Sequence, residues 1–107
     1  MDASHLLYAS DDVVECINEI LESNSIRFVR AADRTVNGDR KTTNLIEIHC
    51  CDDRGEVVLV IEKRRSQPRA NLMLIPSRRF VFWRNKNSDR LSEHLARIMY
   101  DRGASDT

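Results

Sequence analysis

Arginines interleaved with aromatic residues form the pattern in this sequence that comes closest to a functional signature. Between positions 64 and 86, six arginines and one lysine surround the aromatic residues Phe80, Phe82 and Trp83. Arginine binds phosphate and carboxylate groups through two parallel hydrogen bonds, and aromatic rings stack on nucleic-acid bases. The segment therefore predicts anion binding, with nucleic acid as the leading ligand. The candidate anion-binding residues are Arg64, Arg65, Arg69, Arg78, Arg79, Arg84 and Lys86.

The same pattern also has a purely structural explanation, in which the arginines pair with acidic residues and the aromatic rings fill a core. Up to residue 62 the chain has 13 acidic and 6 basic residues, and from residue 63 it has 4 acidic and 11 basic residues. Such a chain is neutral in total but has a dipolar surface if the two halves face different ways. We expect two basic patches at opposite ends of a strand, one with Arg64, Arg65 and Arg69 and the other with Arg78 and Arg79.

His49, Cys51 and Asp53 alternate along a predicted strand, so their side chains would lie on one face. These residue types bind zinc, but zinc sites usually draw paired ligands from two places in the chain. The other histidines, His5 and His94, have no partners at ligand spacing. We therefore expect no bound metal and no other cofactor.

A second possible metal site includes Asp52 and Asp53, followed by Glu62 and Arg64. This order resembles the acidic and basic strand residues of metal-dependent nucleases, although the basic residue there is usually lysine. No serine, cysteine and histidine are arranged as a nucleophile with its base, so we expect no catalytic residue. A nuclease-like enzyme remains an alternative.

The three cysteines favour an intracellular, cytoplasmic protein. Their number is odd, and Cys50 and Cys51 are adjacent on a predicted strand, which points their side chains to opposite faces. We expect reduced thiols, with Cys16 and Cys50 in the core and Cys51 the most reactive. The sequence has no apolar stretch of membrane-spanning length, and its first residues do not resemble a signal peptide.

Hydrophobic periodicity predicts one domain covering residues 1–107, with an ordered core of about 10–103. Val13, Ile17, Ile20 and Leu21 recur at helical spacing, and the unbroken apolar run at 57–61 is typical of a central strand. Residues 1–9 remain unassigned. The expected elements are a helix from residue 10 to about 23, strands at 26–36, 44–51, 56–63, 72–75 and 79–83, and a helix from 88 to 102 that ends at Gly103.

This order, α-β-β-β-β-β-α, predicts an α+β fold with an antiparallel β-meander of about five strands and both helices on one face. The later strands carry apolar residues on both faces, so the uncovered face would show an apolar patch to water. A second copy of the chain is the simplest cover, and we expect a homodimer. Its interface residues would be Ile75, Val81 and Trp83.

The element order is similar to that of frataxins, of the double-stranded-RNA-binding domain and of dimeric secretion-effector chaperones. The resemblance is one of topology. The helix at 10–23 does not match the acidic ridge of frataxins, and the lysine-rich helix of the RNA-binding domain is missing. Topology of this kind implies a fold and does not transfer a function.

The sequence therefore predicts a small, non-enzymatic binding or adaptor protein. It would engage a protein or nucleic-acid partner through an exposed sheet face and an arginine-rich edge, with no membrane or small-molecule cofactor involved. The alternatives are the nuclease-like enzyme and a dimeric chaperone-like protein that binds an acidic protein segment.

Overall fold

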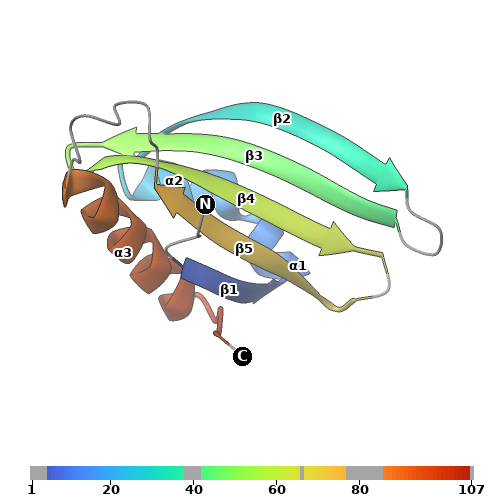
Figure 1. Ribbon diagram of the computed structural model, residues 1–107. Coiled ribbons are helices and arrows are strands. Elements are labelled where there is room, and N and C mark those ends of the chain that lie inside the picture. The colour runs from blue at the N-terminus through green and yellow to red at the C-terminus, as the bar shows by residue number, and fades with distance from the viewer. Residues whose placement is uncertain (1–4, 38–41, 66, 77–85, 107) are drawn as a thin grey trace.

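The computed structural model describes residues 5–37, 42–65, 67–76 and 86–106, which form a five-stranded antiparallel sheet with helices packed on it (Figure 1). The strand order is β1-β5-β4-β3-β2, which confirms the predicted α+β fold with an antiparallel meander. The strands are β1 (His5–Ser10), β2 (Arg27–Asn37), β3 (Thr42–Asp52), β4 (Gly55–Arg64) and β5 (Arg69–Pro76). The helices are α1 (Asp11–Glu15), α2 (Ile17–Ser23) and α3 (Lys86–Asp101).

The N-terminal strand β1 is an addition to the predicted element order. It precedes the first helix and pairs with β5, from His5 opposite Leu74 to Ser10 opposite Arg69. The expected strand at 79–83 lies outside the described residues, so the fifth strand of the observed sheet is β1. A strand order of this kind depends on pairing between residues about 60 positions apart, which local periodicity does not reveal.

The predicted first helix is divided into α1 and α2 at Cys16. The backbone N–H of Cys16 donates to the carbonyl of Val13 at 3.2 Å, which is a tighter turn than the α-helix makes. The apolar face nevertheless continues through the break, because Val13, Ile17 and Ile20 are all buried. The predicted helix face is thus confirmed, and the tight turn changes only its continuity.

The C-terminal helix α3 ends in the way that its sequence predicts. Gly103 has a φ of 102°, in the region that glycine tolerates and other residues rarely adopt. The N–H of Gly103 donates to the carbonyl of Tyr100 at 3.0 Å, and that of Ala104 donates to the carbonyl of Met99 at 3.0 Å. These bonds satisfy carbonyls at the end of α3 and turn the chain back toward β1.

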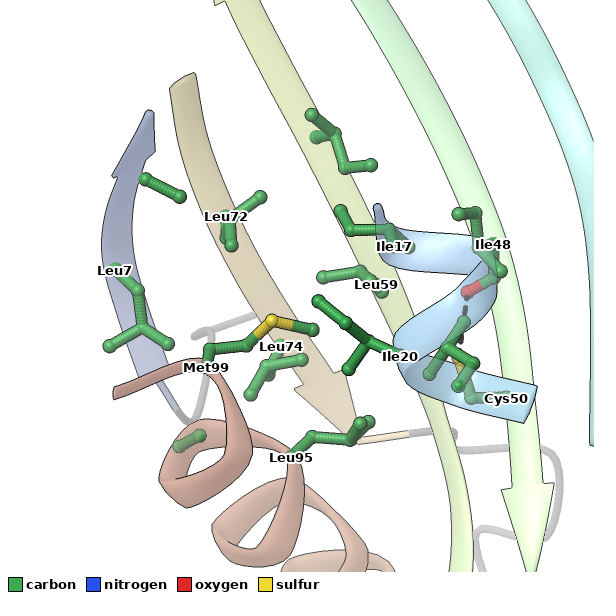
Figure 2. Close-up of a cluster of buried hydrophobic side chains, with 14 of the residues drawn as sticks. Leu7, Ile17, Ile20, Ile48, Cys50, Leu59, Leu72, Leu74, Leu95 and Met99 are labelled. Carbon is green, nitrogen blue, oxygen red and sulfur yellow. Dashed lines mark hydrogen bonds between the residues drawn. The ribbon is translucent and has the colours of Figure 1, made fainter. Parts of the chain in front are cut away.

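All three helices cover the same face of the sheet, which we call the core face. In Figure 1, α1 and α2 lie behind the strands, and Figure 2 shows how the side chains of α2 meet those of α3 and of the strands in one cluster, to which Val13 of α1 also belongs. The most deeply buried large side chains are Leu7, Ile17, Ile20, Leu21, Ile48, Val57, Leu59, Leu72, Leu74, Leu91, Leu95 and Met99. Among the described helices, none is long and apolar enough to span a membrane.

Candidate binding surface

The face of the sheet opposite the helices, which we call the outer face, is built by residues that alternate along the strands, with one interruption in β2 between Arg30 and Ala32. On β4, Val57, Leu59 and Ile61 point into the core, so Val58 and Val60 point to the outer face. Residues that oppose each other on neighbouring antiparallel strands share a face. The register therefore assigns the paired strand residues to one face or the other.

Five apolar side chains lie together on the outer face, from the edge strand β1 to the central strand β4, and we call them the apolar centre. They come from three adjacent strands, because Leu6 opposes Met73, Met73 opposes Val60, and Val58 opposes Ile75. Leu6 is 47% exposed, and the other four are half-buried, without a helix of the described chain above them. The apolar centre consists of Leu6, Val58, Val60, Met73 and Ile75.

Charged side chains lie beside the apolar centre on the outer face, toward β3 and β2. Glu47 opposes Val60 from β3, and Glu62 follows Val60 along β4. Arg34 on β2 lies in the same cross-strand row as Glu62, with Leu45 of β3 between them. The rim of the outer face therefore carries both signs of charge.

The first predicted basic patch lies at one end of the sheet, where β4 ends and β5 begins. Arg64 forms an ion pair with Glu62, with 3.2 Å between Nε and Oε1. The guanidinium of Arg69 lies over the ring of Tyr8, with its carbon 5.4 Å from the ring centroid, and its Nη1 donates to Ser105 Oγ at 3.3 Å. Two of the three arginines thus already interact within the chain, whereas Arg65 is exposed.

The second predicted patch and part of the predicted interface fall outside the described residues. This applies to Arg78 and Arg79 of the patch, to the further anion-binding candidate Arg84, and to the interface residues Val81 and Trp83. Lys86 begins α3, but its side chain is not among those described. Of the predicted interface residues, Ile75 is described, and it belongs to the apolar centre.

The two adjacent cysteines lie on opposite faces, as their sequence predicts. Cys50 is buried in the core, where its thiol lies 3.8 Å from the carbonyl oxygen of Ile48 (Figure 2). Burial, together with the nearby Cys51, raises the pKa of Cys50 to about 12. Cys51 lies on the outer face, half-buried, between Arg27 of β2 and Glu56 of β4. The Cys50 thiol is therefore a packing group and not a nucleophile.

The possible metal ligands His49, Cys51 and Asp53 do not form a cluster that could hold an ion, and no other set of three among the described residues does. Asp52, beside them, is used in the β3–β4 turn. It accepts hydrogen bonds from the backbone N–H of Arg54 at 2.6 Å and from Nη1 of Arg54 at 2.9 Å. These bonds fix the turn, which is a structural role for this acidic segment.

His94 on α3 lies near the same turn. Burial lowers the pKa of His94, and the charges of Arg54 and Arg97 lower it further, while Asp52 opposes them. The neutral imidazole is therefore favoured in the folded protein. Neither the hydrophobic periodicity nor the spacing of possible ligands in the sequence predicted that His94 lies close to Arg54 and Asp52.

Two features of the outer face were not found from the sequence. Leu6 and Tyr8 reach it through β1, whose position depends on long-range pairing with β5. Arg34 joins the rim through the β2–β3 pairing, 30 residues before the arginine-rich segment. In both cases the missing information was the strand order, because no local sequence pattern places these residues on the outer face.

No protein-family model matches this chain, and no curated protein or solved structure shows significant similarity to it. The outer face and its charges are therefore interpreted from their own chemistry.

Proposed function

We propose that this protein is a non-enzymatic binding protein that engages a macromolecular partner through the outer face of its sheet. One observation carries the proposal. The apolar centre gathers five apolar side chains from three adjacent strands on a face that no described helix covers. Contiguous apolar surface of this kind typically marks an interaction site.

The arrangement of the outer face supports a protein partner. Specific protein interfaces combine an apolar middle with a polar, water-accessible rim. Here Leu6, Met73 and Val60 form a continuous cross-strand row that starts at β1, Glu47 continues the row on β3, and Arg34 lies on the opposite edge strand β2. A protein surface with a similar apolar middle would remove this row from water.

A second copy of the chain is the specific partner that we propose for the outer face. Two-fold dimers place the same patch of both copies in contact, so the patch must be complementary to itself. Apolar side chains meet this condition, and a rim with both signs of charge meets it as well. Glu47 can face Arg34 of the other copy.

Nucleic acid is less well supported as the partner of this face. The described rim has acidic residues among its arginines, and Arg64 and Arg69 interact with Glu62, Tyr8 and Ser105. A phosphate group would have to compete with these contacts. Anion binding by Arg78, Arg79, Arg84 and Lys86 stays a prediction.

Replacing Val60 by lysine tests the proposed interface. Val60 is in the apolar centre, and a lysine there would lie opposite Glu47 on β3, where the two charges attract within one copy. We expect Val60→Lys to fold and to dissociate the dimer, because a desolvated lysine is costly at an interface. Sedimentation velocity would show a change from twice 12.4 kDa to 12.4 kDa.

Tyr100→Lys is the matched control, because Tyr100 is also an exposed hydrophobic residue but lies on α3. This variant should keep the dimer. A wild-type protein that is monomeric at all concentrations, or a Val60→Lys protein that remains dimeric, would contradict the proposal.

A further inference from the structure

The two edges of the sheet differ in a way that the proposed function does not use. At one edge, β1 is paired a second time, since the N–H of Tyr8 donates to the carbonyl of Ser105 at 2.7 Å and the N–H of Ser105 donates back at 2.9 Å. At the other edge lies β2, and none of the described residues pairs with its free side. Figure 1 shows β2 as the upper edge of the sheet.

The first part of β2 is protected against pairing by an irregularity. The register with β3 shifts between Arg30 and Ala32, which marks a β-bulge. Bulges and charged side chains are common devices that keep edge strands from pairing indiscriminately. Here Arg30 and Asp33 also form an ion pair across the bulge, with 3.5 Å between Nη1 and Oδ2.

The second part of β2, residues 32–37, has no such irregularity, and we call it the open half of β2. Its register with β3 is regular from Ala32 opposite Glu47 to Asn37 opposite Thr42. Residues 33–37 are exposed on both faces. Because alternate residues of an edge strand point their N–H and C=O groups away from the neighbouring strand, this half presents unpaired backbone groups in strand geometry.

The side chains of the open half of β2 indicate what could pair with it. Arg34 and Val36 lie on the outer face, and Val36 is 47% exposed. The whole of β2 carries three arginines and one aspartate, and that aspartate is already paired with Arg30. A strand added here would therefore gain from an acidic residue opposite Arg34 and an apolar residue opposite Val36.

We propose that the open half of β2 binds an extended, acidic and apolar segment of another protein by strand addition. Backbone hydrogen bonds would supply affinity, and the residues opposite Arg34 and Val36 would supply selectivity. A second copy of this chain is disfavoured as the occupant by charge. It would set Arg34 against the β2 of the other copy, whose one acidic residue, Asp33, is already paired with Arg30.

The probe for this proposal is a seven-residue fluorescent peptide in which four threonines alternate with valine, glutamate and valine. A lysine peptide, with lysine in place of the glutamate, tests the charge requirement. A third peptide with alternate N-methylated amides cannot make the backbone hydrogen bonds. We expect the glutamate peptide to bind the wild-type protein about fivefold more tightly than the lysine peptide, and the methylated peptide not to bind.

Reversing the charge of Arg34 gives the sharpest outcome. Arg34 is exposed, so Arg34→Glu should fold normally, and we expect it to prefer the lysine peptide. Arg90→Glu is the control with the same change at an exposed position of α3, and it should keep the wild-type preference. Hydrogen exchange should also show that amides within residues 32–37 become protected when the glutamate peptide is added.

Several results would overturn the proposal. These are equal binding of the methylated peptide, no saturable binding of any peptide, or protection that appears on the apolar centre instead. Protection of residues 32–37 that grows with protein concentration alone would assign the edge to a second copy. Because Val60→Lys should lose the dimer but keep the peptide, failure of the edge and failure of the outer face can be told apart.

Discussion

Neighbouring residues of β4 show how differently the two faces of one sheet are used. On the core face, Val57, Leu59 and Ile61 are at most 2% exposed, whereas Val58 and Val60 on the outer face are half-buried. Both faces carry aliphatic residues here. The difference arises because α1, α2 and α3 all pack on the core face.

This comparison separates two reasons for which a sheet carries apolar residues. Side chains of the core face contribute to folding, because burying them removes apolar surface from water within one chain. The apolar centre gains nothing comparable from the described residues. We propose that its apolar character reflects a contact that forms after folding, which is the basis of the proposed interface.

The largest expected effect comes from truncating the two faces separately. Leu59→Ala should reduce the free energy of unfolding by about 2–5 kcal/mol, because it leaves a cavity in the core. Val60→Ala, one residue away, should cost about 1 kcal/mol or less, since its side chain is only half-buried in the monomer. Urea denaturation at low protein concentration measures both.

The same pair of variants can also break the comparison. If a second copy covers the outer face, the cost of Val60→Ala should rise with protein concentration, because dimerisation stabilises the folded state by mass action. The cost of Leu59→Ala should not. If Val60→Ala and Leu59→Ala cost the same free energy of unfolding at every protein concentration, the two faces would be equally buried within one chain.

The sequence was a good guide to which residues of a strand share a face and to where most of the described elements begin. The alternation of Ile46, Ile48 and Cys50 was confirmed, with Ile48 and Cys50 buried and Ile46 packed against the core. The sequence could not show which face of β4 is buried in the core, because a run with apolar residues at both odd and even positions has no periodic signal. The helices make that choice, and their placement is a tertiary property.

The candidate surface was harder to predict than the fold. Ile75 was assigned to the interface, and it lies in the apolar centre. Leu6 was missed, because β1 is a six-residue strand that acquires its place only through β5. Arginine density along the sequence also overstated the free charge, because Arg64 and Arg69 are engaged by Glu62, Tyr8 and Ser105.

The adjacent cysteines provide a chemical test of the same comparison. With a pKa of about 12, Cys50 has a thiolate fraction at pH 8 that is lower than that of an ordinary thiol by on the order of a thousandfold. We expect iodoacetamide to modify Cys51 in the native protein and Cys50 only after unfolding. Peptide mass spectrometry after timed labelling distinguishes them. Early labelling of Cys50 would contradict its placement in the core.

The ionisation of Cys50 also gives a direction for alkaline stability. Its folded-state pKa is raised above the ordinary value, so the unfolded state loses this proton first as the pH rises. The contribution of Cys50 to stability is present below about pH 9 and is lost as the pH rises toward 12. Cys50→Ala should remove this part of the pH dependence and cost some packing.

The smallest expected effect concerns His94, which lies on α3 near the β3–β4 turn. The pKa of His94 is lowered in the folded protein by burial and by the charges of Arg54 and Arg97. The unfolded state therefore binds a proton more readily, and stability should fall as the pH drops below about 6.5. His94→Gln should flatten this slope between about pH 7 and pH 5, as measured by thermal unfolding at each pH. His49→Gln, at an exposed position of the outer face, is the control for the loss of a histidine as such. If wild-type and His94→Gln proteins lose stability in parallel as the pH falls, protonation of His94 does not weaken the packing of α3 on the sheet. The acid sensitivity would then arise elsewhere in the chain.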